Sequence, residues 1–90
     1  MIYIEDDIHC ELDGPYPTVD EAVAELRRRA TIAWDAPPNQ APCTSWKTCG
    51  REYYVVEYRG EGDSAEVLRR LHVLGISAKG VVWAEGYGPI

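Results

Sequence analysis

Hydrophobic and polar residues alternate at the start of the chain, and this spacing predicts short strands. Most odd positions there are polar, while the even positions are mainly apolar. The apolar set is Ile2, Ile4, Ile8, Cys10 and Leu12. A period of two is typical of a strand with one buried face. Because Asp6 breaks the phase, we expect a strand over 2–5, an acidic turn or bulge, and a second strand over 8–12. The Gly/Pro-rich segment 14–17 then reads as a loop.

The strongest pattern predicts a helix over 19–32. Apolar residues recur there on one stripe at the spacing of an amphipathic helix. Thr18 and Glu21 form a capping-box pattern, in which each side chain bonds the backbone N–H of the other residue. Acids at the start and three arginines toward the end complement the helix dipole.

Residues 34–50 predict a long loop, because they combine three prolines, two tryptophans and two cysteines without a sustained pattern. Loops longer than about 12–15 residues are uncommon in compact domains and are usually functional or disordered. We expect a function here, because disorder would leave two Trp and two Cys in water.

The rest of the chain predicts further sheet and one ambiguous segment. Residues 52–59 are rich in β-formers and carry apolar residues on both faces, which favours a central strand. Over 64–74, an apolar stripe at helical spacing favours a second short helix, and the alternative is a strand near 70–77. A last strand is expected over 81–85.

These elements predict a single α+β domain over residues 1–90. Its sheet would be small and mostly antiparallel, with three to four strands packed on one long helix. A chain of this length has room for about one small domain and buries a thin core.

The charge is uneven along the chain. Residues 1–25 hold eight acids and no Lys or Arg, while the remainder holds seven acids and nine bases, so the two parts carry −8 and +2 and sum to −6. An acidic N-terminal edge favours a basic protein partner and speeds encounter with it. The same charge argues against direct nucleic-acid binding, which needs Lys and Arg against phosphates.

Hydropathy predicts no association with a membrane. No apolar run approaches the roughly 20 residues of a membrane span, and no secretory pattern opens the chain, so we expect a cytoplasmic protein.

Candidate binding residues are the N-terminal acids and the loop aromatics. Tyr and Trp, which replace Phe entirely here, are enriched at interface hot spots, and proline stiffens the loop that presents two of the Trp. The expected binding residues are Asp6, Asp7, Glu11, Trp34, Trp46 and Lys47. The alternative is that both loop Trp fold back over the sheet and enlarge the core.

A thiol or zinc site is the competing hypothesis. Cys43 and Cys49 lie in the loop at a Cys-x5-Cys spacing, which is not the usual zinc spacing, and no resident cofactor is expected. Further metal ligands would come from Cys10 or His9 and from His72. A Cys43–Cys49 disulfide and plain buried thiols also remain open.

Two weaker candidates concern ionisable side chains. His9 and His72 could act together as acid and base in a hydrolase. The adjacent acids Glu5, Asp6 and Asp7 could ligate a divalent cation, although such runs usually form a solvated turn.

The leading hypothesis is a small acidic non-enzymatic protein-binding module. In size, acidity and lack of a catalytic motif, the chain resembles bacterial immunity proteins and inhibitors of nucleases or phage-defence complexes. This resemblance implies an inhibitor or immunity-type protein that neutralises a basic protein partner. The acidic N-terminal edge would steer the encounter, and the Trp-bearing loop would provide the buried contact.

Overall fold

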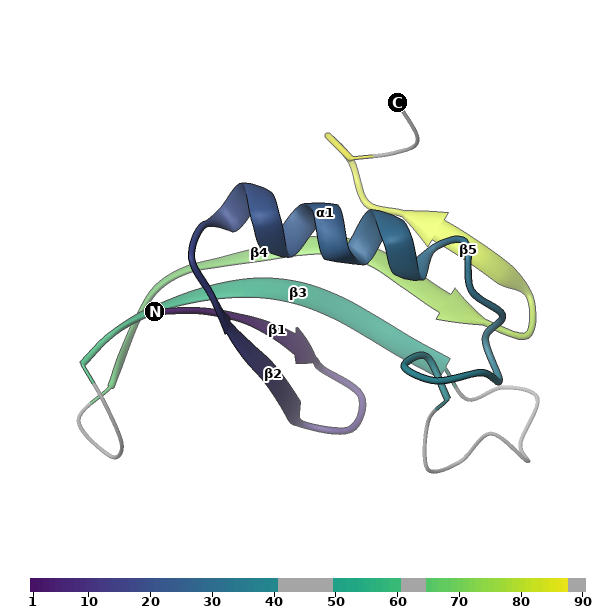
Figure 1. Cartoon of the computed structure of the whole chain (residues 1–90), viewed down its shortest axis with the longest axis horizontal. Coiled ribbons are helices and arrows are strands. Elements are labelled where there is room, and N and C mark those ends of the chain that lie inside the picture. The colour runs from purple at the N-terminus through teal and green to yellow at the C-terminus, as the bar shows by residue number, and fades with distance from the viewer. Residues whose placement is uncertain (41–49, 61–64, 88–90) are drawn as a thin grey trace.

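The computed structural model describes residues 1–40, 50–60 and 65–87 (Figure 1). These residues form one helix and one five-stranded antiparallel sheet, in the order β2-β1-β3-β4-β5. The elements are β1 (Ile2–Asp6), β2 (Glu11–Tyr16), α1 (Val19–Arg29), β3 (Gly50–Arg59), β4 (Glu66–Ser77) and β5 (Gly80–Trp83). The α+β class and the antiparallel sheet are therefore confirmed, whereas the predicted count of three to four strands is too low.

The helix α1 lies across one face of the curved sheet (Figure 1), and the core fills the space between them. Its apolar stripe packs on strands β1, β3 and β4 through buried aliphatic side chains and Tyr53. The core residues are Ile2, Ile4, Ala22, Val23, Leu26, Tyr53, Val55, Val73, Leu74 and Ile76. No helix of the described ranges has the length and apolarity needed to cross a membrane.

The helix begins as predicted but ends earlier. The Thr18 hydroxyl accepts the backbone N–H of Glu21 at 3.1 Å, as expected for an N-cap. The helix ends at Arg29 instead of residue 32. The side-chain amide of Asn39 caps this end by bonding backbone carbonyls of the last turn and of the segment after it. Asn39 Nδ2 donates to the carbonyls of Arg29 and Ile32, each at 2.9 Å, so these groups are satisfied without another helical turn.

The first hairpin differs from its predicted boundaries because Asp6 keeps the strand phase that it was expected to break. Ile2, Ile4 and Asp6 all lie buried on the helix side of the sheet, so β1 runs to Asp6 instead of ending at residue 5. Residues 7–10 form the turn, and β2 starts at Glu11 and not at residue 8. The segment 14–16, predicted as loop, belongs to this exposed edge strand, where a proline is tolerated.

The predicted helix over 64–74 is wrong, because β4 pairs with β3 from Glu66 onward. The reason is a bulge: Tyr53 pairs with Leu74, and Tyr54 pairs with His72, so Val73 is an extra residue. The bulge places Leu71 and Leu74 on the same face three residues apart. That spacing is also the spacing of a helical stripe, so the sequence pattern imitates a helix.

The predicted loop over 34–50 lies partly outside the described residues. Residues 34–40 contain turns without regular structure, as expected, and Gly50 already belongs to β3. Trp46, Lys47, Cys43 and Cys49 fall in the part of the chain that is not described. The strands predicted over 52–59 and 81–85 correspond to the central strand β3 and to the short strand β5.

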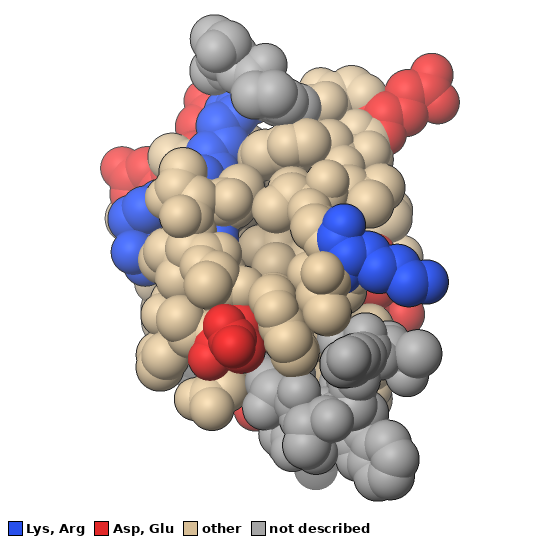
Figure 2. Space-filling view, turned by 90° about the vertical axis from the view of Figure 1, so that its right-hand side faces the viewer, with Lys and Arg blue, Asp and Glu red and all other residues tan. Residues whose placement is uncertain are grey.

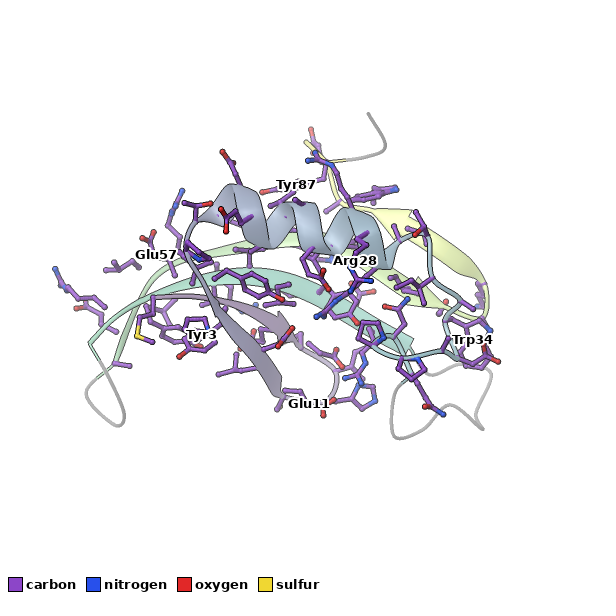
Figure 3. The ribbon with its side chains drawn as sticks, in the orientation of Figure 1. Tyr3, Glu11, Arg28, Trp34, Glu57 and Tyr87 are labelled. Atoms are coloured by element: carbon purple, nitrogen blue, oxygen red, sulfur yellow. The ribbon has the colours of Figure 1, made fainter. Side chains whose placement is uncertain are left out.

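Around Tyr54, the sheet face away from α1 is covered by polar and aromatic side chains. The guanidinium of Arg70 lies 3.8 Å from the centre of the Tyr54 ring, and His72 stacks on that ring at 4.6 Å. Tyr3 also points to this side (Figure 3). Val56 beneath them is only 1% exposed, so these side chains cover this part of the face.

We expect a close backbone approach to make Gly50 intolerant of any side chain. A Cβ at Gly50 would collide with the carbonyl oxygen of Ile76, whereas a Cβ at Gly75 would meet the mobile carboxylate end of Glu52. Gly50→Ala should therefore lower the free energy of unfolding by about 1–3 kcal/mol, and Gly75→Ala by less. Urea unfolding of both variants tests this, and an equal loss in the two would contradict it.

Candidate functional site

A pocket of about 330 Å³ opens beside the end of α1 and the β1–β2 hairpin. Four separate stretches of the chain build it: the hairpin, the end of the helix, the segment after the helix and the start of β3. The lining residues are Ile4, Asp6, Glu11, Leu12, Asp13, Arg29, Pro38, Arg51 and Tyr53. Charged groups of both signs and apolar side chains therefore meet in one concave place.

Asp6 is the buried acid of this pocket, with only 2% of its surface exposed. Oδ1 accepts the backbone N–H groups of Ile8 and Glu52, each at 3.1 Å. Oδ2 lies 2.5 Å from Nδ1 of His9 and accepts from Nη1 of Arg51 at 2.9 Å. This carboxylate thus joins the hairpin turn to β3 and is fully engaged inside the protein.

Arg51, on β3, forms the ion pair that balances the charge of Asp6. Its Nη1 also bonds Glu11, while Nη2 donates to the Gln40 carbonyl at 2.7 Å and Nε to the Asn39 carbonyl at 3.3 Å. Burial alone would lower the pKa of Arg51, but the hydrogen bonds to Glu11 and Asp6 outweigh it and raise the pKa. The guanidinium therefore stays charged and holds the segment after the helix against the sheet.

Arg29 forms the second charged centre, at the last position of α1. Its Nε donates to Glu25 at 2.7 Å, and its Nη2 bonds Asp13 of β2. Its guanidinium lies 5.4 Å from the centre of the Tyr53 ring. Burial opposes the charge of Arg29, yet the hydrogen bonds to both acids raise its pKa. The ion pair fixes the end of the helix to the edge strand.

Asp13 has a second partner in Tyr16. The Tyr16 hydroxyl donates to Oδ2 of Asp13 at 2.9 Å, and burial together with this bond raises the pKa of Tyr16 to about 12. Tyr16 therefore remains a neutral donor at physiological pH. Strand β2 in this way holds the Asp13 carboxylate at a defined position on the exposed rim of the pocket.

The exposure of the charged groups decides what an approaching molecule meets. The side chains of Arg29 and Arg51 are only 8% and 11% exposed, whereas those of Asp13 and Glu11 are 54% and 52% exposed. Glu11 projects at the outer end of β2 (Figure 3). Among the charged groups of the pocket, the carboxylates of Glu11 and Asp13 are therefore much more exposed than the two guanidiniums.

The structure brings together two of the expected binding residues and separates the others. Asp6 and Glu11 line the pocket, and Asp6 lies at its buried end. Asp7 is exposed and pairs with Arg70 at 2.6 Å outside the pocket. Trp34 is half-buried and packs against the core, as in the alternative interpretation of this residue. Trp46 and Lys47 are not among the described residues.

Sequence reasoning missed the arginines of the site. Arg29 was explained by the helix dipole alone, and Arg51 carried no pattern at all. The available signal was the charge split, since a block of acids followed by a basic remainder can pair within one chain. Six of the eight N-terminal acids do pair with arginines, five of them with arginines of later segments and Glu25 with arginines of its own helix. These acids are Glu5, Asp6, Asp7, Glu11, Asp13 and Glu25.

A metal centre finds little support in the described residues. Asp6, His9 and Glu11 place ligand atoms within 4.8 Å of one another, but the guanidinium of Arg51 already bonds both carboxylates. Cys10 is an exposed free thiol in the hairpin turn. The other cysteines proposed as ligands, Cys43 and Cys49, lie outside the described residues.

The structure gives no support to the proposed pairing of His9 with His72. His9 contacts Asp6 on the helix side of the sheet, whereas His72 bonds Glu52 at 2.7 Å on the opposite face. The two rings are thus engaged by different acids, and neither bonds the other.

The chain matches no protein-family model, no curated protein and no solved structure. The function must therefore be inferred from the site itself.

We expect adjacent acids of the hairpin to differ sharply in their effect on stability. Asp6→Asn leaves the mostly buried Arg51 short of its partner and should lower the free energy of unfolding by about 3–5 kcal/mol. Asp7→Asn removes an exposed pair and should cost about 1 kcal/mol or less. Chemical denaturation of both variants measures the difference, and similar values would show that Asp6 is not a structural charge.

Glu25 should make the protein sensitive to acid. The hydrogen bond from Arg28, helped by Arg29, lowers the pKa of Glu25 below its ordinary value of 4.5 against an opposing effect of burial. Its contribution to stability is therefore present above pH 4.5 and is lost as the pH falls through the lower folded-state pKa. Thermal melts between pH 3 and 6 should show a shallower pH dependence for Glu25→Gln; an unchanged slope would argue against this pairing.

Proposed function

We propose that this protein is a small non-enzymatic binding module for a protein partner with a basic surface. The observation that carries the proposal is the arrangement of the pocket, in which the exposed carboxylates of Glu11 and Asp13 stand above buried, paired guanidiniums. An inhibitor or immunity-type protein that neutralises its partner fits this description. The three lining carboxylates outnumber the two guanidiniums, which gives the pocket a net negative charge.

The rigidity of the site supports this proposal. Glu11 and Asp13 lie on β2, which is paired to β1, and each carboxylate is bonded to an arginine from another segment. A partner would thus pay little to order these side chains, and preorganisation of this kind favours affinity.

The distribution of charge also favours a local site over a broad acidic patch. Because most N-terminal acids are paired internally, the chain does not present them as one free surface. Seen from the β5 side, charges of both signs lie scattered among uncharged side chains of the described residues (Figure 2). The net charge of −6 still favours encounter with a basic partner over long range, while the pocket would determine the contact.

The residues that the sequence predicted for binding do not all have the same role in this proposal. Asp6 serves to hold Arg51 and Glu11 in place instead of contacting the partner. Trp46 and Lys47 remain proposed contacts and lie outside the described residues. The thiol or zinc alternative, based on Cys43 and Cys49 with Cys10 and His72, gains no supporting observation from the described residues.

We expect the two acids at the rim of the pocket, Glu11 and Asp13 (the rim acids), to control capture of the partner. The immobilised full chain should retain a basic protein from host extract at low salt, and Glu11→Gln with Asp13→Asn should reduce that retention about tenfold or more. Raised salt should act in the same direction. Quantitative mass spectrometry of the eluates provides the measurement.

A matched variant controls for net charge in this experiment. Asp20→Asn with Glu85→Gln changes the charge by the same amount at two exposed acids away from the pocket. It should retain the partner almost as well as the unaltered chain. If both double variants lost the same amount of retained partner, net charge alone would explain the loss. That result would contradict a specific role of the pocket.

A further inference from the structure

We infer that the pocket between β2 and the end of α1 receives a single arginine side chain of the partner. This inference rests on the proposed function, because it names the chemical group that the basic partner would insert. The guanidinium would bridge Glu11 and Asp13 at the rim, and its methylene chain would lie on the apolar walls.

The buried arginines exclude an anion as the preferred occupant. A phosphate or carboxylate would compete with Glu11 for Arg51 and with Asp13 for Arg29, because these acids already bond the two guanidiniums. Each guanidinium would also keep its second, more buried acid, since Asp6 holds Arg51 and Glu25 holds Arg29. A cation meets no such competition, because the more exposed charged groups of the pocket are carboxylates.

The rim carboxylates have acceptor capacity left for a cation. Glu11 accepts its hydrogen bond at Oε1, and Asp13 accepts both of its hydrogen bonds at Oδ2. From the described residues, Oε2 of Glu11 and Oδ1 of Asp13 receive no hydrogen bond. Because an ionised carboxylate offers about four lone-pair sites, both groups can accept further donors without giving up their arginines.

The shape of the pocket favours one side chain with an apolar stem. Ile4 and Pro38 supply apolar parts of the wall. The volume of about 330 Å³ is at the low end of the range for small-ligand pockets, which runs from about 300 to 1,000 Å³. An arginine has a three-methylene stem that packs on such walls while its charged head stays at the polar rim.

The presence of two carboxylates favours a guanidinium over an ammonium. Glu11 and Asp13 stand two residues apart on one strand, so they project from the same side of β2. A guanidinium is a planar fork with five donors and can bond two carboxylates at once, whereas a lysine ammonium acts as a compact point charge. We therefore expect arginine to bind better than lysine.

Titration with N-acetyl-arginine methylamide, followed by backbone amide NMR shifts, tests the inference on the whole protein. The probe should shift the amides of residues 11–13 with a millimolar dissociation constant. The lysine analogue should bind more weakly, and the citrulline analogue, which keeps the shape but lacks the charge, should not bind. No shift with the arginine probe, or equal binding of the lysine or citrulline analogue, would overturn the inference.

Substitutions then assign the binding to the rim. Glu11→Gln with Asp13→Asn should weaken binding of the arginine probe about tenfold, and Asp20→Asn with Glu85→Gln should leave it unchanged. Equal binding to both double variants would place the probe elsewhere and overturn the inference. The comparison of arginine with citrulline on the unaltered chain stands even if the rim variant unfolds.

The two proposals fail in different ways. A partner that is captured through the rim acids, combined with no response to the arginine probe, would leave the proposed function standing and overturn the arginine anchor. A specific response to the arginine probe without any captured basic protein would support the anchor and contradict the proposed function.

Discussion

The buried carboxylate of Asp6 is the constraint around which this part of the molecule is arranged. A charge removed from water must be paired and hydrogen-bonded, and Asp6 receives both from Arg51 and from two backbone N–H groups. Arg51 in turn reaches the carbonyls of the segment after α1 and the side chain of Glu11. The hairpin turn, β3 and the helix-following segment are thus placed relative to one another by one ion pair.

Pairing of this kind also explains why the acidic composition does not produce a free acidic surface. An acidic block usually reads as a surface for solubility or for steering. In this chain most of that block is neutralised by arginines from distant segments, so charge serves the tertiary structure first. What remains accessible is a small number of half-exposed carboxylates, including Glu11 and Asp13, held by the arginines beneath them. A binding function is therefore better sought in a defined pocket than in the overall charge.

Local sequence signals predicted the elements that depend on local physics. The Thr18 cap and the apolar stripe located α1, and the β-rich run over 52–59 located the central strand. The segment 64–74 was misread because the bulge at Val73 is a tertiary pairing event that the spacing cannot show. Asp6 was expected at the surface because its burial depends on Arg51, which is distant in sequence. The pocket could not be predicted for the same reason.

Asn39 closes the helix from ten positions downstream, and this has a consequence for how the structure opens. A terminal glycine cap would let the end of α1 fray independently of the sheet. Here the last helical carbonyl, the Tyr53 hydroxyl and the Arg51 guanidinium all bond the same asparagine. Local unfolding of this corner would therefore be cooperative, so amide hydrogens near the end of α1 and the start of β3 would exchange with solvent as one group.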